Sequence, residues 1–256
     1  MLGAIIGDII GSRFEKHNIK SKQFELFTRD SKFTDDTVLT VAVADAILNN
    51  KDFEKTTKNY ARRYPFAGYG GTFKKWMFGI LKGPYNSWGN GSAMRVSPVG
   101  FAFESVETIL AQAQNSASIT HNHPEGIAGA QAIAIAIYLA RTGKSKNDIK
   151  EQIEKMFHYD LSRNLDSIRE HYVFDVSCRG SVPESILVFL ESTDFEDAIR
   201  TAISIGGDSD TIACMAGGIA QAYYREIPRN MIDQAYAKLP LKFIQIIELF
   251  NSKYLQ

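Results

Sequence analysis

The segment 205–224, IGGDSDTIACMAGGIAQAYY, constrains the fold more than any other part of the chain. Two glycines lead into acidic and hydroxyl residues, which suit the first turn of a helix because its N–H groups are free and its dipole end is positive. The residues that follow are small or apolar on almost every side, and a helix of that composition is buried. Ala213, Gly217 and Ala220 share one narrow face, so a second helix can approach closely there.

This buried helix carries the carboxylates of Asp208 and Asp210 and the hydroxyl of Thr211 to a fixed position near the protein's centre. A carboxylate held there needs a proton, a cationic side chain or a metal ion. Because no lysine or arginine lies nearby in the sequence, a metal ion is favoured.

A second cluster of the same kind, the TDDT sequence at 34–37, stands before another strongly apolar helical run. Alone, such a cluster is more typical of a helix cap than of a ligand set. Its repetition before two core helices indicates two halves of one cation site. The ligands offer only oxygen atoms, which suits Mg²⁺ or Mn²⁺ rather than zinc, and His121 and His123 show no zinc-type spacing. Four carboxylates favour two ions, roughly 3.5–4 Å apart.

The N-terminal segment is apolar apart from one carboxylate. Gly3, Gly7 and Gly11 recur every four residues, so on a helix they form a groove for a neighbouring helix. Two roles are considered equally for Asp8: a buried structural carboxylate that is hydrogen-bonded, and a functional group. Glu15 follows at the expected helix end, where a surface glutamate is the default. The polar segment 16–32 predicts a long loop, a type of segment that often serves as a lid.

Two glycine-rich segments are candidates for binding a nucleotide. Gly68, Gly70 and Gly71 lie in a flexible stretch whose N–H groups could cradle phosphate, with a plain turn as the alternative. The stretch does not match the P-loop pattern GxxxxGK[ST]. In the segment 85–95, Trp88 stands among small polar residues, where it either stacks on a base or anchors the loop to the core.

Helical periodicity dominates the rest of the chain, and alternation of period two is almost absent, which predicts an all-α protein. No linker interrupts the special residues, so one domain covering 1–256 is expected. Segment 161–179 is left unassigned. Helices are expected at 38–48, 52–64, 105–117, 126–141, 145–157, 183–190, 195–204, 231–239 and 241–250.

The chain has 29 basic and 29 acidic residues. Because its net charge is zero, no overall electrostatic attraction to nucleic acid or to an anionic membrane is expected. Its two cysteines, Cys178 and Cys214, indicate neither a disulfide framework nor a CxxC metal site. The apolar N-terminus is too short to span a bilayer and reads poorly as a signal peptide. A cytoplasmic protein is expected, and a monomer.

The residues alone thus indicate a two-metal hydrolase in which glycine loops bind phosphate and an aromatic side chain stacks on a nucleotide base. Five motifs then occur in order: GxxxGDxxGxxxE, TDDT, GNGxAMRV, TH before a core helix, and GGDSDTIAxMAGxIA. Together, from Leu2 to about Tyr224, they resemble the ADP-ribosylglycohydrolase family, which includes arginine-linked, serine-linked and nitrogenase-reductase-regulating hydrolases.

The resemblance implies a compact, single-domain orthogonal bundle of helices around a binuclear Mg²⁺ or Mn²⁺ centre. It places Glu15 on a mobile flap beside the reacting ribose, with Glu15 or an aspartate such as Asp36 handling the proton. The implied metal ligands are Thr34, Asp35, Asp36, Asp208, Asp210 and Thr211. The residues implied to contact ADP-ribose are Gly68, Gly70, Gly71, Ser87, Trp88, Gly89, Asn90 and His121.

The implied reaction is hydrolysis at ribose C1″ of an ADP-ribosylated protein or small molecule, with positive charge developing on the ribose ring. ADP-ribosyl-arginine is favoured by analogy with compact family members, and serine or another O-linked acceptor is the alternative. Two other classes stay open. One is a catalytically retired structural member, against which the presence of all four aspartates argues; the other is a two-metal nucleotide phosphoesterase.

Overall fold

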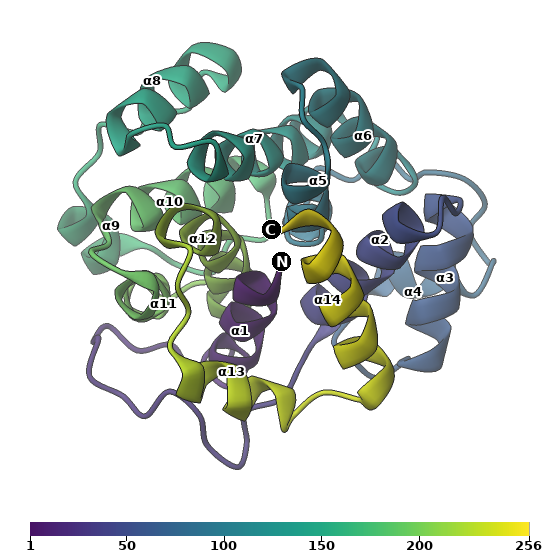
Figure 1. Cartoon of the computed structure of the whole chain (residues 1–256), viewed down its shortest axis with the longest axis horizontal. Helices are drawn as coiled ribbons and strands as arrows, with labels where there is room; N and C mark the ends of the chain where they lie inside the picture. The colour runs from purple at the N-terminus through teal and green to yellow at the C-terminus, as the bar shows by residue number, and fades with distance from the viewer. Residues whose placement is uncertain (256) are drawn as a thin grey trace.

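Two helices, α1 (Leu2–Gly11) and α12 (Ser209–Tyr224), cross at the centre of the molecule (Figure 1). Glycines bring their backbones into contact: a Cβ added to Gly7 would lie 2.1 Å from the carbonyl oxygen of Ala213, and one added to Gly217 would lie 2.4 Å from that of Gly3. No side chain fits in such a space. The close helix approach predicted for both segments is confirmed.

The computed structural model describes residues 1–255, which contain fourteen α-helices and one short 3₁₀ helix. Within this range no sheet forms, and a single isolated bridge joins Gly89 to Ser177. The all-α class is confirmed. The other helices are α2 (Asp35–Leu48), α3 (Phe53–Arg63), α4 (Gly71–Met77), η1 (Asn90–Ser92), α5 (Ser97–Ala102), α6 (Val106–Ser118), α7 (Pro124–Arg141), α8 (Lys146–Phe157), α9 (Leu165–His171), α10 (Cys178–Glu191), α11 (Phe195–Ser204), α13 (Arg229–Tyr236) and α14 (Leu241–Tyr254).

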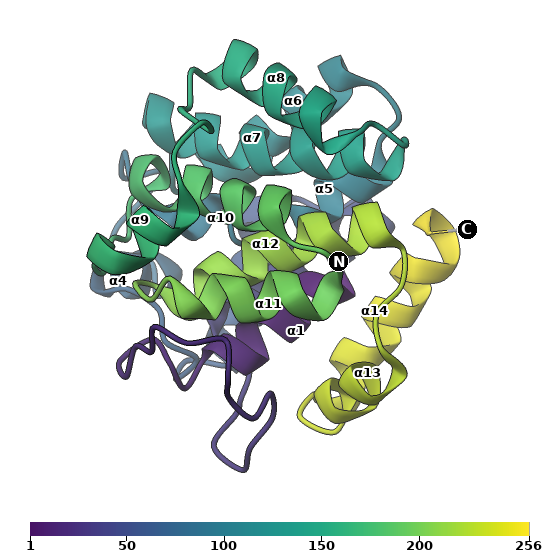
Figure 2. The same cartoon turned by 90° about the vertical axis from the view of Figure 1, so that its left-hand side faces the viewer.

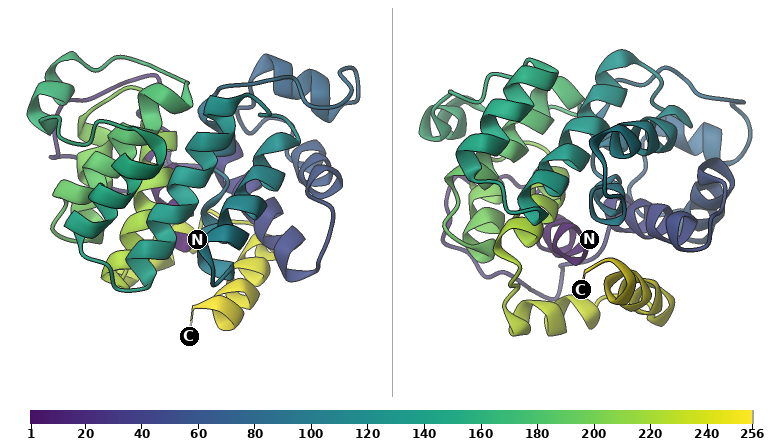
Figure 3. Two further views of the ribbon diagram at one scale, coloured as in Figure 1. Left: turned by 90° about the horizontal axis from the view of Figure 1, so that it is seen from above. Right: turned by 45° about the horizontal axis from the view of Figure 1, so that its top comes forward.

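The outer helices pack around the central pair in layers. Figure 2 shows α6, α7 and α8 above α10 and α12, with α11 and α1 below them. In Figure 3, α2, α3 and α4 lie on one side of the molecule and α9, α10 and α11 on the other. Apolar side chains from Met1 to Phe250 form one continuous core, which confirms a compact single-domain bundle.

Helix α10 corrects the predicted helix 183–190, because it begins five residues earlier, at Cys178. The hydroxyl of Ser177 caps this start by accepting from the N–H of Gly180 at 2.9 Å. Pro183 therefore lies inside the helix instead of opening it. The carbonyl of Arg179 therefore lacks the N–H partner that a helix would normally give it. Helix α9 occupies part of the segment that the sequence left unassigned.

Residues 12–34 form a long connection without helix or strand, as predicted, and it runs along one edge of the molecule (Figure 2). The first glycine-rich segment differs from the expectation of a flexible turn, since α4 already begins at Gly71. None of the helices within residues 1–255 combines the length and apolar character needed to cross a bilayer.

Candidate metal centre and active-site cleft

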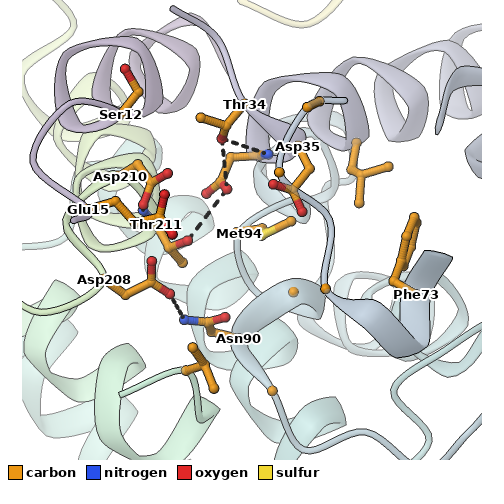
Figure 4. Close-up of a pocket in the computed structure, with 18 of the residues that line it drawn as sticks. Ser12, Glu15, Thr34, Asp35, Phe73, Asn90, Met94, Asp208, Asp210 and Thr211 are labelled. Carbon is orange, nitrogen blue, oxygen red and sulfur yellow. Dashed lines mark hydrogen bonds between the residues drawn. The ribbon is translucent and has the colours of Figure 1, made fainter. Parts of the chain in front are cut away.

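A cleft of about 1360 Å³ opens where the starts of α2 and α12 face the loop 12–34. This volume suits a ligand of dinucleotide size. All the residues predicted to bind metal or ADP-ribose or to transfer the proton line this one cleft, although they come from six separate segments. These residues are Glu15, Thr34, Asp35, Asp36, Gly68, Gly70, Gly71, Ser87, Trp88, Gly89, Asn90, His121, Asp208, Asp210 and Thr211. Figure 4 shows Glu15, Asp35, Asp208 and Asp210 around one space.

Local backbone geometry explains how the two acidic clusters reach the cleft. Thr34 is the N-cap of α2, and its hydroxyl oxygen accepts from the N–H of Asp36 at 3.4 Å. Before α12, Gly206 and Gly207 take φ values of +75° and +72°, which only glycine adopts readily. Asp208 follows this turn and does not cap the helix with its side chain. Its Oδ2 instead accepts from Asn90 Nδ2 at 2.7 Å.

Three fully buried carboxylates form the tightest group in the site. Asp8, Asp36 and Asp210 each present an oxygen within 4.8 Å of the others. Asp36 Oδ1 is buried without a hydrogen-bond partner. Among residues 1–255, no ion pair reaches any of these three side chains. A buried set of oxygen donors without a cationic partner fits a divalent metal ion such as Mg²⁺ or Mn²⁺.

Asp8 is the member of this group that the predicted ligand set lacks. It accepts from both the N–H and the hydroxyl of Thr34, at 2.9 and 2.6 Å, and from the N–H of Thr37 at 3.1 Å. The Thr37 hydroxyl donates to it as well. The buried, hydrogen-bonded role considered for Asp8 is therefore present. Its carboxylate also ties α1 to the cap of α2, which fixes the geometry of the acidic group.

Burial raises the pKa of every carboxyl group in the cluster, and repulsion between neighbouring carboxylates adds to it at Asp35, Asp36 and Asp210. Burial raises the pKa of Asp8 to about 6, against the hydrogen bonds from Thr34 and Thr37. Burial and then the charge of Asp8 raise the pKa of Asp35 to about 8. Burial and the charge of Asp8 raise the pKa of Asp36 well above its ordinary value, and burial and the charge of Asp36 do the same for Asp210. The cluster holds protons at neutral pH unless a cation replaces them.

Asp35 and Asp208 flank the tight group on its cleft side. The N–H of Asp35 donates to the carbonyl of Ala67 at 2.8 Å, which joins α2 to the first glycine-rich segment. Gly68 has φ +118°, and a Cβ at this residue would lie 2.8 Å from Asp35 Oδ1. A glycine is thus required for Asp35 to approach this segment. Where Gly70 and Gly71 line the cleft, by contrast, a Cβ would meet open space.

Glu15 reaches the same cleft from the loop 12–34 and is half-buried. Burial and the charge of Asp208 raise the pKa of its carboxyl group, against the opposite effect of Lys16 and Lys32. A carboxyl group whose pKa is raised toward neutrality can both give and take a proton. The position and the electrostatics of Glu15 suit proton transfer.

The second glycine-rich segment forms the opposite wall of the cleft. Asn90 N–H donates to the carbonyl of Val176 at 2.8 Å, and Cys178 N–H donates to that of Trp88 at 3.0 Å, so this wall is held in place. The side chain of Trp88 is 50% exposed on the rim. This exposure favours a stacking surface over a core anchor. His121 is buried behind the segment and lines the cleft.

Comparisons with known proteins agree with these features. Residues 1–253 match the sequence profile of the family described as ADP-ribosylglycohydrolase. The human protein named ADP-ribosylhydrolase ARH3 is 28% identical, with 88% of this chain and 84% of that protein covered. Its relative of the same name in Xenopus tropicalis is 29% identical, covering 90% and 88%.

A solved structure titled ADP-ribosylglycohydrolase-related protein complex superposes with a TM-score of 0.76. It covers 99% of this chain and 95% of that chain at 24% identity, which establishes the shared fold. Together with the match to the family profile, this shows that the chain belongs to the ADP-ribosylglycohydrolase family and is a glycohydrolase enzyme.

Proposed function

We propose that this enzyme hydrolyses the glycosidic bond at ribose C1″ of an ADP-ribosylated protein or small molecule and releases ADP-ribose. One observation carries the proposal: Asp36 and Asp210 of the buried acidic group, Glu15 and Trp88 all line a single cleft. An acidic centre for the ribose, a glycine segment for the pyrophosphate and an aromatic face for the adenine together match the parts of ADP-ribose.

The metal centre would hold two Mg²⁺ or Mn²⁺ ions on the proposed ligands Thr34, Asp35, Asp36, Asp208, Asp210 and Thr211. Asp8 supports this group through its hydrogen bonds to the cap of α2. When bound, such ions neutralise the carboxylates, orient ribose hydroxyls and lower the pKa of a bound water. The unpartnered Asp36 Oδ1 supports direct contact with a cation.

Glu15 is the proposed proton-transfer residue, and Asp36 is the alternative. Glu15 is the better candidate because it is half-buried and reaches the cleft from a loop, whereas Asp36 is enclosed in the acidic group. In the proposed step, Glu15 protonates the leaving atom while the bond to C1″ breaks and positive charge develops on the ribose ring. It then takes a proton from the attacking water.

The proposed ADP-ribose contacts extend away from the acidic centre. Gly68, Gly70 and Gly71 would line the pyrophosphate, and the open space at the last two leaves room for it. Trp88 would stack on the adenine. Ser87, Gly89, Asn90 and His121 complete the proposed contacts from the opposite wall.

The acceptor group is proposed to be linked through an oxygen atom, such as a serine hydroxyl. Three basic side chains, Arg13, Lys16 and Lys32, line the cleft together with Glu15. The charges of Lys16 and Lys32 act on Glu15 itself. A guanidinium leaving group would meet repulsion from these lysines, whereas a neutral hydroxyl would not. The arginine linkage that the sequence favoured is kept as the alternative.

The test is incubation with arginine-, serine- and acid-linked ADP-ribosylated peptides in the presence of Mg²⁺ or Mn²⁺. Release of free ADP-ribose, fastest from the serine-linked peptide, supports the proposal. Fastest release from the arginine-linked peptide would reject the oxygen linkage alone. AMP as the product would identify a phosphoesterase, and no product with any peptide would identify a retired member.

A further inference from the structure

Three buried side chains form a continuous path from the core to the cleft. The guanidinium of Arg95, which is fully buried, donates from Nη2 to the carbonyl of Ser116 and to Thr120 Oγ1, each at 2.8 Å. Thr120 Oγ1 lies 2.7 Å from Nδ1 of His121. The path thus joins the segment 85–95 to the end of α6 and to the connection between α6 and α7, and both Arg95 and His121 line the cleft.

The direction of these hydrogen bonds follows from the donors available. A guanidinium only donates, so Thr120 Oγ1 accepts from Arg95 and keeps its own proton to give. Thr120 is fully buried, and its Oγ1 lies within hydrogen-bond distance of His121 Nδ1, so one of these two atoms donates to the other. Burial raises the pKa of Tyr85 to about 12, so its phenol keeps its proton. Donation of that proton to Thr120 occupies the second lone pair of Oγ1 and leaves the Thr120 proton for His121. Nδ1 of His121 is therefore an acceptor, and the ring proton is on Nε2.

The Nε2 edge of the ring faces the glycine segment of the cleft wall. A Cβ added to Gly91 would lie 3.1 Å from His121 Nε2, and one added to Gly89 would lie 3.7 Å from it. Burial and the nearby charge of Arg95 lower the pKa of His121 well below its ordinary value. The imidazole is consequently neutral at physiological pH and presents one N–H group beside this wall.

We propose that Arg95 and Thr120 are positioning residues that fix His121 as the neutral Nε2–H tautomer, so that its ring donates one hydrogen bond to an oxygen of the ligand beside Gly89 and Gly91. The opposite tautomer would present a lone pair to the same oxygen and repel it. That this oxygen belongs to ADP-ribose rests on the proposed function. The tautomer itself does not.

The tautomer is measured directly by ¹⁵N NMR of histidine-labelled, ligand-free protein, with His121→Gln used to assign the ring among the five histidines. The proposal expects a protonated Nε2 and an unprotonated Nδ1 in the wild type and in Thr120→Ser, which keeps the hydroxyl. Thr120→Val, which removes it, should populate the Nδ1–H form. A wild-type ring protonated at Nδ1, or a doubly protonated ring at neutral pH, would overturn the proposal.

Titration with ADP-ribose gives a second readout. Thr120→Val should weaken binding about 5- to 10-fold, the effect of losing one neutral hydrogen bond, and raise KM more than it lowers kcat. Thr120→Ser should restore both values. Equal affinity in Thr120→Val and the wild type would overturn the positioning role. If the wild-type ring carries its proton on Nε2 but ADP-ribose does not bind, the proposed function fails while the tautomer assignment stands.

Discussion

Asn18 clasps Gly207 with both ends of its side-chain amide: Oδ1 accepts from the Gly207 N–H at 2.8 Å, and Nδ2 donates to the Gly207 carbonyl at 2.9 Å. Nδ2 also donates to the carbonyl of Phe14 at 2.6 Å. Asn18 lies on the same loop as Glu15, and Gly207 directly precedes Asp208. The clasp therefore connects the proposed proton-transfer residue to the proposed metal-ligand turn.

Replacing Asn18 with alanine should lower kcat about 10- to 100-fold, because Glu15 loses its fixed place relative to Asp208. Affinity for ADP-ribose should change less. Lys22→Ala is the matched control on the same loop, since it removes only the partly exposed ion pair with Asp197 at 2.9 Å. Equal kinetics in the two variants would show that the clasp does not position Glu15.

Glu15→Gln tests proton transfer without a large change in shape. We expect kcat to fall about 10²- to 10⁴-fold, the usual contribution of a positioned acid or base, while calorimetry shows nearly unchanged ADP-ribose binding. Asp36→Asn serves as the comparison, because it should weaken metal binding as well. An unchanged turnover rate in Glu15→Gln would rule the role out.

Much of this site follows from the sequence because its signals are local. The acidic clusters stand at starts of core helices, and the glycine period of α1 matches the small residues of α12, so the crossing brings the clusters together. Asp8 could not be assigned in this way. Its partners Thr34 and Thr37 come from another helix, and only the packing of α1 against α2 reveals them.

The start of α10 and the burial of Arg95 could not be predicted either, because both depend on contacts between residues that are distant in the sequence. The sequence placed the start of this helix at Pro183 because proline normally opens a helix. The true start at Cys178 is fixed by contacts distant in the sequence, such as the bond from the Cys178 N–H to the carbonyl of Trp88. Arg95 resembled any arginine at the end of a motif. Its complete burial and its bonds to Ser116 and Thr120 depend on how the segment 85–95 packs against the end of α6.

The metal-free enzyme should lose stability as the pH rises. The folded-state pKa values of Asp8 and Asp35, about 6 and about 8, exceed the ordinary value of 3.8. Their contribution is therefore fully present below about pH 4 and is lost as pH rises through the folded values, by up to about 1.4 kcal/mol per unit for each group. Thermal unfolding in EDTA should show a falling Tm between pH 5 and 8.

Magnesium provides the control for this pH dependence. Saturating Mg²⁺ should raise the Tm at pH 8 and flatten the pH profile, because bound cations replace the protons. Asp36→Asn should gain little from Mg²⁺, since it removes a central ligand. A Tm in EDTA that is constant or increases over this pH range would contradict the electrostatic account.

The helix crossing can be tested with two glycine substitutions. Gly7→Ala places a Cβ 2.1 Å from the Ala213 carbonyl oxygen and should reduce the free energy of unfolding by about 1–3 kcal/mol or more, as overpacking does. Gly71→Ala, also in a helix, meets open space and should leave folding stability unchanged or slightly higher. Chemical denaturation measures both values. If the two variants had equal free energies of unfolding, the close contact between α1 and α12 would not contribute to folding stability.

The most direct test of the central claim is anomalous scattering from crystals grown in Mn²⁺. Neutralisation of the buried carboxylates by two divalent cations predicts two peaks roughly 3.5–4 Å apart, between the carboxylates of Asp36 and Asp210. Well-ordered crystals with no anomalous peak among the carboxylates of α1, α2 and α12 would contradict it.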